Sequence, residues 1–89
     1  MIERELTVSN RLGLHARATA KLVQLLSGFK CSATLTAKGR EINAKSIMGV
    51  MLLAAGQGTQ LKLRVDGEDE TAAADAVTAL FERRFDEDS

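Results

Sequence analysis

The single histidine of the chain, His15, lies at the start of a predicted helix, two residues before Arg17. The first N–H groups of a helix lack intrahelical acceptors and, together with the helix dipole, favour an anion there. The same field disfavours an imidazolium, so we expect a neutral ring with one nitrogen free to attack. An arginine side chain matches the oxygens of a phosphate. His15, the N–H groups of Ala16 and Arg17, and the Arg17 guanidinium therefore indicate a site that could accept and hold a phosphoryl group.

Two predicted elements position this histidine. Alternating apolar residues over 2–8 predict a strand with one buried face, and the apolar residues of 16–27 recur at roughly helical spacing. Gly13 can take backbone angles that other residues avoid, which suits a tight approach just before His15. An ordinary core or surface histidine remains the alternative, because a lone histidine in a small protein is most often that.

The rest of the chain shows short alternating strands and two further helices. After the last helix we expect Phe85 to close the core and residues 86–89 to fray. The order β-α-β-β-α-β-α predicts an antiparallel sheet with its helices packed on one face. The remaining predicted elements are strands over 31–37 and 40–43, a helix over 46–53, a strand over 60–65 and a helix over 70–84.

Size and composition restrict the class of protein. A chain of 89 residues predicts one domain over 1–89 with one modest core. It has no apolar run near the roughly 18 residues of a membrane span and no signal peptide, so we expect a cytoplasmic protein without membrane insertion. The single cysteine, Cys31, permits no internal disulfide, and no metal site is indicated. Few aromatic residues argue against nucleic-acid binding by base stacking.

Charge is distributed unevenly although the formal net charge is zero. Residues 1–45 hold eight Lys and Arg against three Asp and Glu, whereas residues 46–89 hold four against nine. A basic surface around His15 would attract a phosphate and steer acidic partner proteins. The basic residues nearest in sequence to His15 and Ser46 are Arg11, Arg17, Lys21 and Lys45.

A second informative segment begins at Ser46. Serine is a favoured helix N-cap, and capping alone would justify the residue. The short helix that follows leaves almost no polar face, and two helical turns cannot bury every side. We therefore expect Ile47, Met48 and Met51 to stay exposed as a surface for partners.

The run NRLGLHARA, residues 10–18, closely resembles the active-site signature of the HPr family, the phosphocarriers of the bacterial phosphotransferase system. Residues 43–51 are similar to the regulatory serine segment of that family, and residues 54–59 to its helix-to-strand connection. The three matches occur in family order and at family spacing. One residue departs from the pattern: Ala18 stands where the family usually has proline, and we expect only a slightly looser helix start.

The resemblance implies an α+β fold, an open-faced sandwich of a four-stranded antiparallel sheet with three helices. It also implies a carrier protein rather than an enzyme. Enzyme I would pass a phosphoryl group to Nδ1 of His15, which would pass it to an enzyme IIA-type domain, with Arg17 as charge partner. No cofactor or metal is implied, and we expect a monomer.

Ser46 looks like the site used by the HPr kinase/phosphorylase, although many family members have this serine without such a kinase. A phosphate there would add a charge of roughly −1.5 to −2 to the apolar partner surface and weaken docking of enzyme I. The predicted partner interface consists of Arg11, Leu14, Lys21, Lys45, Ile47, Met48 and Met51.

Two alternatives remain open. The chain could be a nitrogen-branch (NPr-type) or regulatory paralogue, which phosphorylates regulatory IIA proteins and moves no sugar. The segment from Phe81 through Phe85 to Asp88 favours that alternative, whereas Lys45, Ser46 and Ile47 favour HPr proper. A small α/β binding module for RNA or a metabolite, with an incidental His15, is the other alternative, and zero net charge and few aromatics oppose RNA. Neither the sugar nor the IIA partners follow from the sequence.

Overall fold

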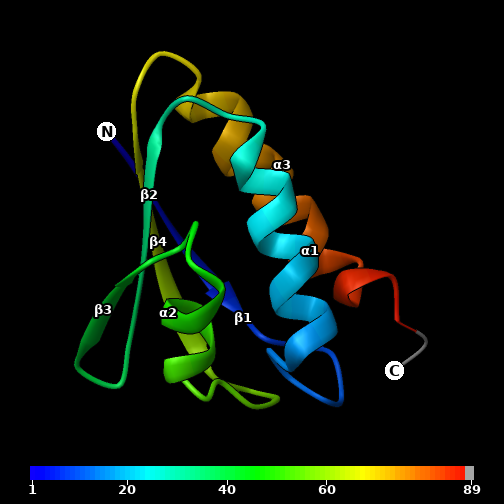
Figure 1. The fold of residues 1–89 in the computed structure, drawn as a ribbon. Helices are drawn as coiled ribbons and strands as arrows, with labels where there is room; N and C mark the ends of the chain where they lie inside the picture. Colours follow the sequence, from blue (N-terminus) through cyan, green and yellow to red (C-terminus); the bar gives the residue numbers. More distant parts are fainter. Residues whose placement is uncertain (88–89) are drawn as a thin grey trace.

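The computed structural model describes residues 1–87. Its four strands form one antiparallel sheet in the order β1-β4-β2-β3, and the helices lie on one face of it (Figure 1). The predicted α+β architecture and element order are confirmed. The elements are β1 (Ile2–Thr7), α1 (Ala16–Ser27), β2 (Ser32–Ala37), β3 (Arg40–Asn43), α2 (Ile47–Leu52), β4 (Gln60–Asp66), α3 (Glu70–Glu82) and the 3-10 turn η1 (Arg84–Asp86).

Alternation along the strands turns one row of side chains towards the helices. In β4, Leu61, Leu63 and Val65 are buried and the residues between them are exposed. The register places Leu61 opposite Leu6 of β1, and Leu63 opposite Leu35 of β2. A slip of one residue would turn this whole row to solvent, so burial fixes the register.

Arg4 interrupts the apolar face of β1. Its guanidinium donates to Oδ1 of Asp75 at 2.9 Å and to Oγ1 of Thr78 at 3.3 Å, and both acceptors are on α3. A long basic side chain can cover apolar surface with its stem while its charged end reaches the rim. The break in the alternation therefore links the edge strand to α3.

The helices bury their apolar stripes against the sheet. Leu22 and Leu26 of α1 are fully buried, as is Phe85 after α3. The rings of Phe81 and Phe85 lie 4.8 Å apart and are tilted by 59°. The prediction that Phe85 closes the core is confirmed. No helix within residues 1–87 is long and apolar enough to cross a bilayer.

The chain end departs from the prediction of fraying. Arg84, Phe85 and Asp86 form η1 with φ angles of 55°, 55° and 61°, the left-handed region that costs roughly 1–2 kcal/mol for a residue with a side chain. The amine of Lys21 donates to the carbonyl of Phe85 at 2.6 Å. The prediction of fraying is thus wrong for residues 86 and 87, which are held in place. Residues 88–89, to which the prediction also applied, lie outside the described residues.

Asp69 ties the connection between α1 and β2 to the start of α3. Its carboxylate accepts the N–H of Lys30 at 2.7 Å and the N–H of Cys31 at 2.9 Å. These hydrogen bonds, that of Lys30 first, hold the pKa of Asp69 below its ordinary value of 3.8, although desolvation opposes the shift. Because this pKa is lowered, the ionised carboxylate stabilises the fold at neutral pH.

Replacing Asp69 with asparagine is therefore expected to reduce the fall in the free energy of unfolding as the pH is lowered. The contribution of Asp69 is complete above about pH 5 and is lost as the pH falls through its lowered folded-state pKa. Urea unfolding at pH 6 and pH 3 should show a smaller loss of stability for Asp69→Asn than for the wild type. Glu68→Gln, an exposed neighbour without a hydrogen bond in residues 1–87, should behave as the wild type. An equal loss in Asp69→Asn and the wild type would contradict this account.

Candidate functional site

His15 is the N-cap of α1, as the sequence predicts. Its backbone is extended, with φ −73° and ψ −178°, and its carbonyl accepts the N–H of Thr19 at 2.8 Å. The ring folds back over the first turn, where Nδ1 accepts the N–H of Arg17 at 3.3 Å. One of the free donors at the helix start therefore points at a ring nitrogen. The N–H of Ala16 makes no hydrogen bond within residues 1–87.

Two residues fix the loop that carries His15. Gly13 has a φ of +69°, and a Cβ there would lie 2.5 Å from the carbonyl oxygen of Ala55. The next residue, Leu14, donates its N–H to that same oxygen at 2.8 Å. On the other side, the fully buried side chain of Asn10 donates to the Gly13 carbonyl at 2.8 Å. The predicted tight approach at Gly13 is confirmed.

The hydrogen bonds of the ring define its tautomer. A backbone N–H can only donate, so Nδ1 of His15 is an acceptor and carries the lone pair. The proton of the neutral ring is then on Nε2, which donates to Oε2 of Glu87 at 2.5 Å. The geometry thus fits a neutral ring with its free nitrogen, Nδ1, beside the N–H of Arg17.

Glu87 is held by more than the histidine. Its Oε1 accepts the side-chain N–H of Asn10 at 3.0 Å. This hydrogen bond is the largest cause of a lowered Glu87 pKa; the hydrogen bond from His15 acts in the same direction, and desolvation opposes both. No feature of the sequence points to Glu87, because it follows the last helical period in a segment expected to fray.

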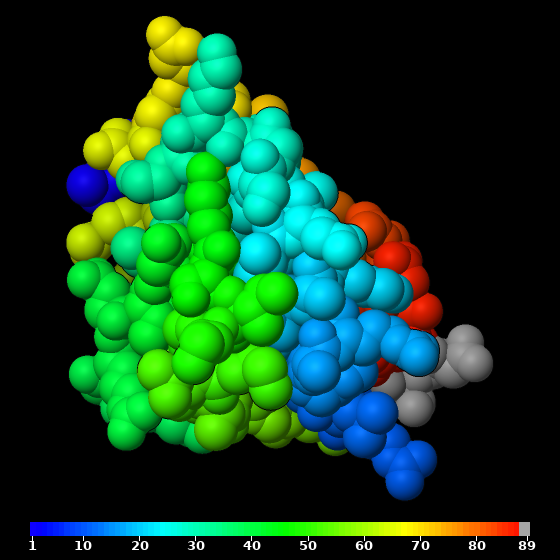
Figure 2. Space-filling view, in the orientation of Figure 1, coloured from blue at the N-terminus to red at the C-terminus, as the bar shows by residue number. Residues whose placement is uncertain are grey.

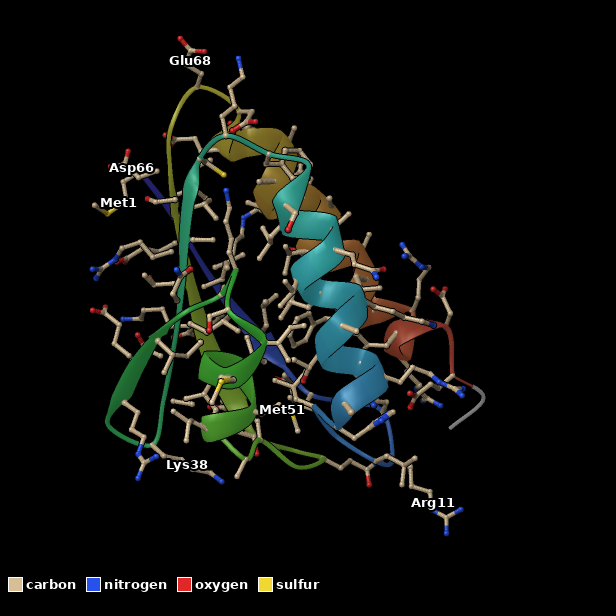
Figure 3. All side chains as sticks on the ribbon, in the orientation of Figure 1. Met1, Arg11, Lys38, Met51, Asp66 and Glu68 are labelled. Carbon is tan, nitrogen blue, oxygen red and sulfur yellow. The ribbon has the colours of Figure 1, made fainter. Side chains whose placement is uncertain are left out.

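A depression of about 700 Å³ opens beside the ring of His15. The guanidinium groups of Arg11 and Arg17 are exposed and make no hydrogen bond or ion pair within residues 1–87, so both can meet an anion. Arg11 projects from the loop before α1 into solvent (Figure 3). The depression is lined by Arg11, Leu12, His15, Ala16, Arg17, Lys21, Asp86 and Glu87.

The other two predicted basic residues have structural partners. Besides its bond to η1, Lys21 lies 3.7 Å from a carboxylate oxygen of Asp86. The amine of Lys45 donates to the carbonyl of Phe29 at 2.7 Å, and Lys45 does not line the depression. The structure therefore brings Arg11, Arg17 and Lys21 to His15 but leaves Lys45 outside.

Helix α2 carries an exposed apolar surface. The Oγ of Ser46 accepts the N–H of Gly49 at 3.1 Å and caps the helix. Figure 2 shows this segment beside the first turns of α1 on one face of the molecule. We call this the α2 surface. It comprises four exposed side chains: Ile47, Met48, Met51 and Leu52.

The predicted exposure of the apolar side chains of α2 is confirmed, whereas Leu14 is buried. The exposed fractions are 48% for Ile47, 79% for Met48 and 47% for Met51, as expected of a surface that can receive a partner. Leu14 is only 5% exposed and belongs to the core, so its assignment to the partner interface is wrong. The backbone N–H of Leu14 is held by the Ala55 carbonyl, and the Leu14 side chain belongs to the core cluster.

A family model described as the phosphorylation site of the HPr component of the phosphotransferase system matches residues 2–83. The chain belongs to the HPr family. Its members are phosphocarriers, so this chain is a phosphocarrier protein and not an enzyme. Within residues 1–87 no group of three or more His, Cys, Asp or Glu side chains could hold a metal ion.

Individual relatives agree with the HPr assignment over the full length. The chain is 66% identical to the phosphocarrier protein HPr of Xylella fastidiosa strain Temecula1, covering 100% of both chains. It is 52% identical to the phosphocarrier protein HPr of Cupriavidus necator, covering 98% of each. A crystal structure of HPr from Thermoanaerobacter tengcongensis superposes with a TM-score of 0.97 at 39% identity, covering 100% of both chains.

Proposed function

We propose that this chain accepts a phosphoryl group from phospho-enzyme I on Nδ1 of His15 and passes it to enzyme IIA-type proteins. The observation that carries the proposal is the orientation of the ring. Its lone-pair nitrogen lies beside the N–H of Arg17 and the depression, whereas its protonated nitrogen is bonded to Glu87. Family membership supports the same reaction.

The local charges support each step of the transfer. When Nδ1 bonds to phosphorus, it can no longer accept the N–H of Arg17, and that donor becomes available to a phosphoryl oxygen. The N–H of Ala16 and the guanidinium groups of Arg11 and Arg17 supply further donors and positive charge. Because His15 remains partly exposed, with 28% of its side chain accessible, the phosphoryl group stays within reach of the next acceptor.

Intact-mass spectrometry after incubation with phosphoenolpyruvate, magnesium and enzyme I tests the proposal. We expect the wild type to gain one acid-labile phosphate and His15→Ala to gain none. Since His15 is the only histidine, a labile phosphate on the variant would contradict the assigned site. No phosphate on the wild type, with enzyme I active on a control carrier, would overturn the carrier function. Adding sugar-branch and nitrogen-branch IIA proteins separately to the phosphorylated chain then identifies its branch.

We also propose that phosphorylation of Ser46, by an HPr kinase/phosphorylase-type enzyme, inhibits docking of enzyme I. The serine is half-buried at the edge of the α2 surface, and its neighbours Ile47 and Met48 are exposed. A dianion at this position would lie among apolar side chains that must lose water on binding, which is unfavourable for a charge. The cap geometry supports the view that the helix itself would survive the modification.

Replacing Ser46 with aspartate is expected to slow phosphorylation of His15 roughly tenfold by raising the apparent KM for the carrier, because a charge at a docking surface costs on the order of one to two kcal/mol. Ser46→Asn is the matched control, since asparagine is an equally good N-cap and carries no charge. Steady-state rates at several carrier concentrations measure the effect. Equal rates for the two variants would contradict the charge mechanism.

A further inference from the structure

The nitrogen of His15 opposite the proposed reacting atom is bonded to a carboxylate. Oε2 of Glu87 lies 2.5 Å from Nε2, and the Glu87 side chain is only 14% exposed. Its second oxygen accepts Nδ2 of Asn10, which also donates to the Gly13 carbonyl. A buried amide thus connects the carboxylate to the loop that carries the histidine.

The orientation of Asn10 is fixed by its two acceptors. Its Oδ1 is buried and has no donor within residues 1–87. An unpaired buried carbonyl oxygen is unfavourable, and turning the amide over would lose both bonds from Nδ2. The amide is therefore committed to donating to Glu87, which leaves one carboxylate oxygen for the histidine.

The three residues before Glu87 have backbone angles that residues with side chains rarely adopt. Three consecutive residues, Arg84, Phe85 and Asp86, take the left-handed conformation. Such a run persists only when its surroundings determine it, and here the burial of Phe85 and the hydrogen bond from Lys21 do so. The position of Glu87 is thus a product of packing and not of a free chain end.

We propose that Glu87 is a positioning residue for phosphoryl transfer at His15. Its carboxylate holds the proton on Nε2, which leaves the lone pair on Nδ1, and it stabilises the positive charge that the ring gains on phosphorylation. The inference rests on the proposed function and adds to it a residue that determines which ring nitrogen of His15 carries the proton.

The transfer balances without movement of the Nε2 proton. The Nδ1 lone pair forms the bond to phosphorus, the bond from phosphorus to the donor group of enzyme I breaks, and its electron pair returns to that donor group. The ring then carries a positive charge, and Nε2–H remains bonded to the ionised Glu87. Return of the phosphoryl group to a IIA acceptor reverses these changes.

Nitrogen-15 NMR of the ring tests the first half of the proposal, and a single histidine makes the assignment unambiguous. We expect the wild type to show a protonated Nε2 and an unprotonated Nδ1. In Glu87→Gln the oxygen of the new amide faces Asn10, so its NH₂ faces Nε2 and favours the opposite tautomer. A wild-type ring protonated on Nδ1, or a Glu87→Gln spectrum unchanged in tautomer, would overturn the proposal.

Single-turnover transfer from phospho-enzyme I tests the second half. We expect Glu87→Ala and Glu87→Gln to be slowed roughly tenfold or more, as for loss of a hydrogen bond to a charged group. Glu82→Gln, an exposed carboxylate on α3, should match the wild type. Thermal unfolding checks that each variant is folded. Normal transfer by folded Glu87 variants would overturn the role of Glu87 alone, whereas a wild type that takes no phosphate would overturn the proposed function with it.

Discussion

Replacement of Phe85 by alanine is expected to lower the free energy of unfolding by about 3–5 kcal/mol, the range for removing a buried aromatic side chain. Phe85 is fully buried and packs on Phe81, so the truncated ring leaves a cavity with little room to collapse. The native state of a domain is stabilised by only about 5–15 kcal/mol. The variant should therefore be marginal, and its left-handed η1 turn should be the first part to open.

Urea unfolding followed by circular dichroism measures this loss. Phe29→Ala is the matched control, because the same ring is removed from a half-buried position outside the main core cluster. We expect a clearly smaller loss for Phe29→Ala. A loss below about 1 kcal/mol in Phe85→Ala would show that the chain end is not part of the cooperative core. In the folded fraction, phosphoryl transfer should be slowed as well, since η1 presents Glu87.

Gly13→Ala is expected to have the second largest effect, a loss of roughly 2–5 kcal/mol together with slower phosphorylation of His15. A Cβ at this position would lie 2.5 Å from the oxygen of Ala55 and 2.8 Å from the α carbon of Gly56. Neither backbone atom can move without shifting the loop. The left-handed backbone, with φ +69°, adds its own penalty for alanine.

Gly39→Ala separates these two contributions. Gly39 has φ +78° in the turn between β2 and β3, and an added Cβ there meets nothing within 4 Å. It should therefore lose only the conformational part, on the order of 1 kcal/mol. Urea unfolding measures the free energy lost in each variant. Equal losses in Gly13→Ala and Gly39→Ala would contradict the expected clash between the added Cβ and the Ala55 oxygen. Transfer rates should fall only in Gly13→Ala.

Most of the fold could be predicted because burial follows short-range periodicity. The alternation of Leu61, Leu63 and Val65 predicts β4 to within one residue at each end, and the apolar spacing of α1 predicts the helix bounds. Arg4 breaks the alternation, and its explanation lies in Asp75, a contact across 71 positions of the chain. A pattern in the residues around Arg4 cannot identify a partner so far away in the chain.

In the candidate site, too, the residues that are close in sequence could be predicted and the distant one could not. His15, Gly13 and Arg17 are close in sequence, so the helix start that brings them together is a local property. Glu87 joins them from 72 positions away, through a turn whose backbone angles residues with side chains rarely adopt. The sequence predicts the burial of Phe85 but fraying after it, and the contacts that order residues 86 and 87 come from Lys21, Asn10 and His15, which lie far away in the chain.

The left-handed η1 turn has a practical consequence for anyone handling this protein. Chain ends usually tolerate trimming and extension, but here the last described residue is a hydrogen-bond partner of the histidine. An affinity tag fused after residue 89 would begin three positions beyond Glu87. The amino terminus lies at the other end of the sheet (Figure 1), where the amine of Met1 pairs with Glu70 at 2.8 Å near the surface. A purification handle fused there would turn that amine into an amide and remove this ion pair, but neither Met1 nor Glu70 lines the His15 depression, so the amino terminus is the better place for a handle.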